Sequence, residues 1–176
     1  MLSLKDLNMG NWEEYGGLVM LSEMSYPEQI RTPKEEFLSV ISEGGAVAKV
    51  ALCGSRYAGN VMGFPLDRDD MTGYGLSEIP AEARVIYVFN LVIDPAFRGM
   101  GYGMALLRDF AATAASMGYS FLVGHFRPGS SLELVRRMGA VEKTVVPDWE
   151  GTSENYVLCY LNLERIKHAA SLALRA

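Results

Sequence analysis

The strongest candidate for chemistry in the sequence is a glycine-rich segment from Arg98 to Gly103, which reads RGMGYG. Glycines at alternate positions let the backbone adopt conformations that other residues resist and approach a ligand closely. A helix is predicted to begin here, so its unpaired N–H groups and the positive end of its dipole converge on the segment. Arg98 adds a planar, permanently charged donor group. Together these features favour binding of an anion such as a phosphate or pyrophosphate.

Other interpretations of the glycine segment fit the sequence less well. A P-loop requires GxxxxGK[ST], and the sequence contains no such string. The dinucleotide fingerprint GxGxxG requires a third glycine, but Leu106 occupies that position when the motif is counted from Gly101. A purely structural turn is the remaining alternative, and it does not account for Arg98 three residues before Gly101.

The residues before and after the glycine segment extend the pattern. Ile93-Asp94-Pro95 ends a strongly β-forming run, and the whole stretch reads VFNLVIDPAFRGMGYGMALL. This stretch resembles the acetyl-CoA-binding segment of GNAT acetyltransferases, which carry [QR]-x-x-G-x-[GA] after a strand ending in V/I-D-P. Arg98, Gly101 and Gly103 fill that pattern. A weaker resemblance extends from about Ala46 to Leu161.

The resemblance implies a set of cosubstrate contacts. The amide near Leu91 or Val92 would stabilise the oxyanion of the tetrahedral intermediate. The amine would attack the thioester directly, so no enzyme nucleophile is required. The residues expected to bind acetyl-CoA are Leu91, Val92 and Ile93 along the pantetheine arm, and Arg98, Gly99, Met100, Gly101, Tyr102, Gly103 and Met104 around the pyrophosphate.

Several positions that carry catalytic side chains in many family members are apolar here. The tyrosine that protonates the departing thiolate stands four residues before a glycine, which corresponds to Gly139, so its position is Val135. The family's frequent asparagine seven residues earlier is Pro128. The positions of the glutamates that act as general base are close to Phe89 or Val123.

His125 is therefore the candidate general base. Strand alternation puts its side chain on the same face as Val123, two residues earlier. An unperturbed imidazole titrates near neutrality, which suits accepting the proton of an amine directly or through a water. The alternative is a bystander histidine at a strand end. Tyr87 and Asn90, the other polar side chains on the central strand, are expected to pack or to form local hydrogen bonds.

The elements that must position these residues follow from hydrophobic periodicity and turn residues. Thr32 before Pro33 is predicted to cap the second helix, and Ser130 with Glu133 forms a capping box. The polar stretch 67–83 is expected to be a loop. The predicted helices cover residues 11–24, 32–43, 103–117, 130–139 and 163–176, and the predicted strands cover residues 46–52, 60–65, 84–93, 121–124, 141–146 and 156–161.

This order of elements predicts an α/β (α+β) fold in one domain over residues 1–176. The family resemblance implies a GNAT fold. We therefore expect a mixed central sheet of about six to seven strands that splays into a wedge at the cosubstrate and is flanked by helices. The strand matching residues 85–93 is expected to carry a bulge and to diverge from the next strand.

Composition narrows the classes of function. The 176 residues are 49% hydrophobic and 21% charged, as in ordinary globular proteins, and the net charge of −5 without a long basic run argues against a nucleic-acid partner. The N-terminus lacks the pattern of a signal peptide, and no apolar run approaches roughly 18 residues. We therefore expect a cytoplasmic protein without a membrane partner. Cys53, Cys159 and the two histidines show no metal-ligand spacing, so no metal is expected.

These observations leave two functional hypotheses. The first is an acetyl-CoA-dependent N-acetyltransferase that acts on a primary amine, either of a small molecule or of a protein N-terminus. The second is a GNAT-fold domain that binds acetyl-CoA as a sensor or interaction module. Trp149 lies in a segment that resembles the substrate loop of protein N-terminal acetyltransferases, and Asp148, Glu150 and Glu154 are either ammonium-binding or simply solvated. The protein is expected to be a monomer or a homodimer.

Overall fold

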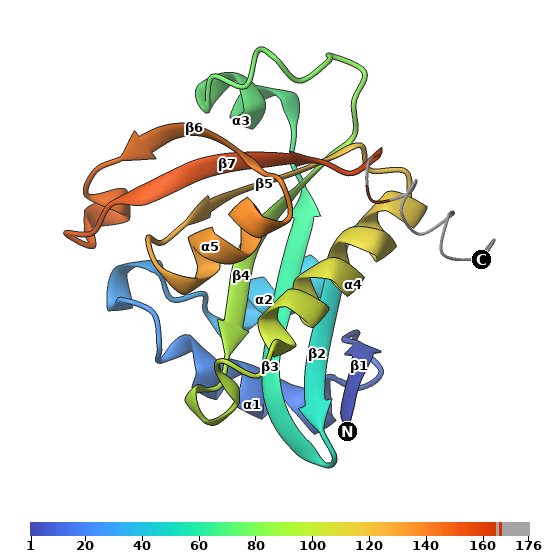
Figure 1. Cartoon of the computed structure of the whole chain (residues 1–176). Helices are drawn as coiled ribbons and strands as arrows, with labels where there is room; N and C mark the ends of the chain where they lie inside the picture. Colours follow the sequence, from blue (N-terminus) through green and yellow to red (C-terminus); the bar gives the residue numbers. More distant parts are fainter. Residues whose placement is uncertain (165, 167–176) are drawn as a thin grey trace.

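The computed structural model describes residues 1–164 and 166, which form a seven-stranded mixed sheet with helices on both faces (Figure 1). This confirms the predicted fold class. The strands are β1 (Leu2–Asp6), β2 (Val47–Cys53), β3 (Arg56–Pro65), β4 (Val85–Ile93), β5 (Phe121–Phe126), β6 (Val141–Val146) and β7 (Tyr156–Asn162). The helices are α1 (Trp12–Glu23), α2 (Lys34–Ser42), α3 (Arg68–Gly73), α4 (Tyr102–Ser116) and α5 (Ser130–Arg137), with short 3-10 turns η1 (Glu28–Ile30), η2 (Pro95–Phe97) and η3 (Trp149–Gly151).

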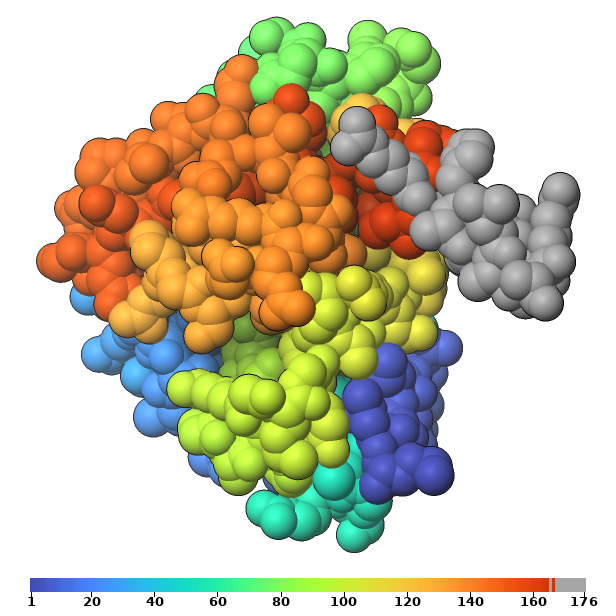
Figure 2. Space-filling model, in the orientation of Figure 1, coloured from blue at the N-terminus to red at the C-terminus, as the bar shows by residue number. Residues whose placement is uncertain are grey.

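The sheet consists of two antiparallel parts joined by one parallel pair. The strand order is β1-β2-β3-β4-β5-β7-β6. Among the described strands, only β4 and β5 run parallel, and α4 provides the crossover between them. β6 is an edge strand whose side chains are mostly exposed, and it contributes to the orange surface in Figure 2.

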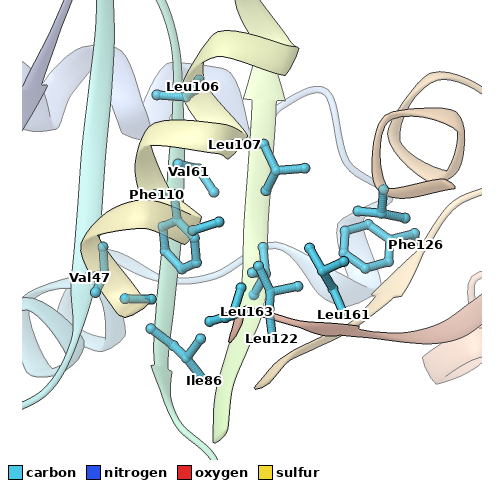
Figure 3. Packing of buried hydrophobic residues seen from close by; sticks show 14 of the residues in the cluster. Val47, Val61, Ile86, Leu106, Leu107, Phe110, Leu122, Phe126, Leu161 and Leu163 are labelled. Carbon is cyan, nitrogen blue, oxygen red and sulfur yellow. The ribbon is translucent and has the colours of Figure 1, made fainter. Parts of the chain in front are cut away.

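The main core lies between the sheet and α4. Leu106, Leu107 and Phe110 form the apolar stripe predicted for this helix, and all three side chains are fully buried. They meet strand residues such as Ile86 and Leu122 (Figure 3). The opposite face of the sheet is covered by α1 and α2, with buried residues that include Trp12, Val19, Phe37, Val50 and Met62.

Two elements differ from the prediction in kind. No element was predicted before residue 11, but residues 2–6 form β1, where Leu2 and Leu4 alternate with polar residues and pair with β2. The stretch 67–83 is not entirely loop, because it contains α3. Asp67 caps this helix by accepting a hydrogen bond from the amide of Asp70 at 2.8 Å, which stabilises a six-residue helix that has no apolar period.

The predicted helix caps are also corrected. The residue at the N-cap of α2 is Pro33 rather than Thr32. The capping box of Ser130 and Glu133 does not form, because Gly129 occupies the N-cap with a φ of 114° and Ser130 is already helical. Other boundaries shift by a few residues: the turn between β2 and β3 is shorter than predicted, and β5 is longer.

The C-terminal helix predicted for residues 163–176 falls largely outside the described residues. Within the described part of the chain, no helix is both long and apolar enough to cross a bilayer.

Two glycine-to-alanine substitutions are expected to change stability in opposite directions. A Cβ at Gly63 would stand 2.6 Å from the carbonyl oxygen of Tyr87 and 2.7 Å from the Phe110 ring, so Gly63→Ala should lower the free energy of unfolding by about 1–3 kcal/mol. A Cβ at Gly17, within α1, meets nothing within 4 Å. Gly17→Ala should therefore raise it by about 0.5–1 kcal/mol through helix propensity. Urea unfolding measures both, and equal effects would contradict the packing of β3 against β4 and α4.

Candidate active site

The parallel pair β4–β5 separates after three residue pairs. Residues 85–87 pair with residues 121–123, and beyond that point the two strands continue without pairing to each other. We call the opening between residues 88–93 of β4 and residues 124–126 of β5 the β4–β5 wedge. It is the splay that the family resemblance implies.

A bulge in β4 sets the direction of its side chains at the wedge. The ladder between β3 and β4 shifts register between Met62 and Gly63, which leaves Phe89 without an opposite residue. Phe89 packs on α2, with its ring centroid 5.7 Å from that of Phe37, and the next residue, Asn90, hydrogen-bonds to α1. Two consecutive side chains thus point to the same face, as at a β-bulge. The predicted bulge is confirmed.

The glycine segment connects β4 to α4 and lies at the surface beside α5. In Figure 2, green surface of β4 is visible in the hollow between the yellow-green surface and the orange surface. Gly99 and Gly101 have φ values of 76° and 80°, in the left-handed region that glycine adopts without cost. In the part of the chain that the structure describes, no protein group accepts a hydrogen bond from the amides of residues 99–104. We call these six amides at the start of the 15-residue helix α4 the anion cradle, because unpaired amides at a helix N-terminus are suited to an anion.

Gly103 and Arg98 complete the cradle in different ways. A Cβ at Gly103 would stand 2.9 Å from Leu134 and 3.3 Å from Ile93, so glycine allows the start of α4 to pack closely on both β4 and α5. Arg98 is exposed, and its Nε donates to the carbonyl oxygen of Ile93 at 3.1 Å. This bond holds the guanidinium next to the cradle.

The hydroxyl of Tyr26 fills the β4–β5 wedge at Leu91. It donates to the Leu91 carbonyl oxygen at 3.1 Å and accepts from the Leu91 amide at 3.0 Å. Burial raises the pKa of Tyr26 above its ordinary value, so the phenol stays protonated and can donate. The main-chain groups expected to contact the cosubstrate at Leu91 are therefore occupied by a side chain from the segment between α1 and α2.

A buried polar network fixes that segment against the bulge. Glu23, at the end of α1, is only 2% exposed. Its carboxylate accepts from the amide of Thr32 at 2.9 Å and from the side chain of Asn90, which in turn accepts from Asn60 of β3. Burial raises the pKa of Glu23. The network links α1, the entry to α2 and the bulge of β4.

His125 lies among aromatic rings rather than in free contact with solvent. Its Nδ1 is 2.8 Å from the hydroxyl of Tyr87, and its ring stacks on Trp149 with centroids 3.8 Å apart. The edge of Tyr74 closes a third side at 4.9 Å. Burial lowers the pKa of His125 to about 4, so the expectation of titration near neutrality is wrong. The imidazole is neutral at pH 7, and its basicity is weaker than the sequence suggested.

The apolar residues at the family's catalytic positions belong to the packed core. Val123 and Val135 are both completely buried. Cys159 is also buried, which raises the pKa of its thiol to about 12 and leaves it in the unreactive thiol form. None of these three side chains supplies a proton donor or acceptor to the wedge.

Sequence reasoning missed the polar residues of α1 and of the segment that follows it. The buried stripe of α1 runs through Trp12, Tyr15 and Val19 to Glu23, whereas Met24, the last residue of the predicted helix, is 62% exposed. Glu23 could have been singled out from the sequence, because it is a carboxylate at a position of the apolar stripe of this helix. Tyr26 carried no local signal beyond ending a helix, because its partner Leu91 is 65 residues away.

The fold and the site define a class of protein: an α/β acetyltransferase with a splayed sheet and an anion cradle at the crossover helix. The family model described as Acetyltransferase (GNAT) family matches residues 7–139, and the chain belongs to this family. No curated protein sequence matches the chain.

Solved structures share the fold at low sequence identity. NAA60 from Arabidopsis thaliana, in complex with acetyl-CoA, is 16% identical over 93% of this chain and 99% of its own, with a TM-score of 0.76. The NatC complex bound to Gag peptide and CoA contains a chain that is 12% identical over 92% of this chain and 98% of its own, with a TM-score of 0.74. A polyamine N-acetyltransferase from Drosophila melanogaster is 16% identical over 92% and 100%, with a TM-score of 0.70.

The burial of neutral His125 predicts a specific dependence of stability on pH. Its folded pKa of about 4 lies below the ordinary value of 6.5, so the unfolded chain binds the proton first as the pH falls. Stability from the neutral imidazole is complete above pH 6.5 and is lost between 6.5 and 4. From pH 7 to 4.5 the parent should lose about 2 kcal/mol more than His125→Asn. Urea unfolding of both proteins at both pH values measures this difference, and parallel losses would contradict the assigned burial.

Proposed function

We propose that the protein is an acetyl-CoA-dependent N-acetyltransferase that transfers an acetyl group to a primary amine. The observation that carries this proposal is the set of six unpartnered amides, residues 99–104, at the mouth of the β4–β5 wedge. A helix N-terminus with left-handed glycines fits a pyrophosphate. An unpaired strand next to it fits the amide-containing arm that follows the pyrophosphate in CoA.

The residues present fit acetyl-CoA along the whole length of the wedge. The cradle, with Arg98 beside it, would hold the pyrophosphate. The pantetheine arm would run along residues 91–93 as an additional strand, because this part of β4 does not pair with β5. The thioester would then lie near the Leu91 amide, where Tyr26 now places a hydroxyl that both donates and accepts.

In the proposed reaction the amine nitrogen attacks the thioester carbon directly. The Leu91 or Val92 amide stabilises the oxyanion of the tetrahedral intermediate, and the intermediate collapses with release of the CoA thiolate. An acceptor that is bound as an ammonium ion loses one proton before its nitrogen attacks, and the nitrogen loses a second proton as the amide forms. The departing CoA thiolate takes up one of these protons. His125 is our candidate to pass the other to solvent through a water, because its low pKa disfavours full protonation of the imidazole at neutral pH.

A second candidate function is binding of acetyl-CoA without catalysis. It is favoured by Val123 and Val135, because the side chains that replace the family's base and acid are buried in the core. Release of thiol from acetyl-CoA in the presence of a panel of primary amines separates the two functions. Amine-dependent thiol release supports the enzyme, and binding without it supports the sensor or interaction module.

Loss of the cradle should abolish the binding of acetyl-CoA. Gly101→Val places a β-branched residue at a φ of 80° and blocks the approach of the ligand to the amides. Gly75→Val is the matched control, because Gly75 has a φ of 67°, equally open surroundings and a position in the loop after α3. Both variants should lose similar stability, but only Gly101→Val should lose the thermal shift produced by acetyl-CoA and CoA. Arg98→Ala should weaken that shift.

Acetyl-CoA at one hundred times its dissociation constant should raise the free energy of unfolding of the parent protein by about 2.7 kcal/mol. A parent protein whose melting temperature does not respond to either compound would refute the proposed function.

Removal of the Tyr26 hydroxyl should strengthen the binding of acetyl-CoA. In Tyr26→Phe the amide and carbonyl of Leu91 lose their partner in the free protein, so the cosubstrate no longer competes with a phenol for them. We expect the dissociation constant to fall by up to about tenfold, which calorimetry measures. Tyr119→Phe is the control, since its hydroxyl bonds to the Gly45 carbonyl. Weaker binding by Tyr26→Phe would show that the phenol assists the cosubstrate instead.

A further inference from the structure

The hydroxyl of Tyr156 is buried without a hydrogen-bond partner. Tyr156 is the first residue of β7 and is only 4% exposed. In the described part of the chain no protein group bonds to its phenolic oxygen. Other buried tyrosines are satisfied, as Tyr119 is by Gly45. An unpartnered buried hydroxyl costs free energy, so its retention in the site calls for a ligand that supplies the missing bond.

A carboxylate oxygen two residues away is in the same condition. Glu154 uses Oε1 to bind Arg127, the residue that follows β5. Its Oε2 is buried and has no partner among the described residues. Glu154 lies in the bend that precedes β7, and burial together with the nearby charge of Glu154 raises the pKa of Tyr156. The two unpartnered oxygens, one negatively charged and one neutral, are therefore neighbours, and we call these two residues the wall.

This wall stands at the β5 side of the β4–β5 wedge. Val157 pairs with Phe126, the last residue of β5, so Tyr156 lies at the end where β5 has left β4. The Tyr156 ring is 6.1 Å from Trp149, which stacks on His125. The η3 turn that carries Trp149 contacts η1, which begins two residues after Tyr26. The wall and the Tyr26–Leu91 contact therefore belong to the two sides of one site.

We propose that Tyr156 and Glu154 form the subsite for the protonated primary amine of the acceptor. This inference rests on the proposed function and specifies how its second substrate is recognised. A primary ammonium carries three N–H donors, which can bond to the Tyr156 hydroxyl and to Glu154 Oε2 and leave one for water. The carboxylate supplies the complementary charge. The subsite selects cationic amines over neutral or anionic acceptors of the same shape.

Paired conservative substitutions test the subsite. Tyr156→Phe and Glu154→Gln each remove one bond, and a hydrogen bond to a charged group corresponds to roughly a tenfold effect or more on affinity. We expect KM for the amine to rise about tenfold or more in each variant, with unchanged affinity for acetyl-CoA. Tyr160→Phe and Glu142→Gln are matched controls and should behave like the parent, because Tyr160 lies in the same strand and Glu142, like Glu154, is paired with an arginine. An unchanged KM in both test variants overturns the proposal.

A stability measurement separates recognition from a structural role. Because the Tyr156 hydroxyl has no protein partner among the described residues, Tyr156→Phe should not lower the midpoint of urea unfolding. Tyr119→Phe, which loses its bond to Gly45, should lower it. A Tyr156→Phe variant that is destabilised and keeps the parental KM would show that the hydroxyl serves the fold alone.

Failure of the proposed function is distinguishable from failure of the subsite. If the parent binds acetyl-CoA but acetylates no amine, butylammonium is titrated into the protein and followed by NMR. Weaker binding of butylammonium by both variants than by the parent supports the subsite even without catalysis. Equal binding by all three proteins, or none by the parent, overturns it.

Discussion

A strand whose neighbour diverges must still satisfy its backbone hydrogen-bonding groups, and β4 meets this constraint in an unusual way. β5 leaves it after Tyr87, so the polar groups of the following residues have no second ladder. Tyr26 supplies a donor and an acceptor to Leu91 from a distant segment. The bulge, the Glu23 network and the position of α1 all serve to keep this phenol in place. Because the backbone groups of this strand are bonded to a displaceable side chain, a ligand can form hydrogen bonds with them instead.

The two faces of the sheet present different chemical groups at the wedge. The side of α4 carries the anion cradle and a dry core, so it offers backbone amides and little side-chain chemistry. The opposite side carries the aromatic cluster around His125 and the contact between η1 and η3. Since Tyr26 belongs to the segment that contains η1, its displacement by one substrate would alter the surface offered to the other.

The glycine cradle and the apolar stripe of α4 could be predicted because both arise from local spacing of residue types. The short strand β1 could not, since five residues with two leucines give too little alternation to define a strand without its partner β2. The low pKa of His125 depends on rings brought in by three other elements. Similarly, Tyr156 is unusual only because no protein group in the described part of the chain forms a hydrogen bond with its buried hydroxyl. Local sequence carries no record of such absences.

The position of β7 between β5 and β6 has a consequence for the order in which the molecule is assembled. β6 precedes β7 in the chain but pairs with no other described strand, so it must wait in an unpaired state until β7 has been synthesised. β2 and β3 pair across a tight turn at residues 54–55, so this part of the sheet forms more readily. The wedge is defined only when β5 has docked in parallel on β4. During translation the half of the wedge built on β4 would therefore exist before the wall built on β7, and the nascent chain would expose an incomplete sheet edge until its last strand emerges.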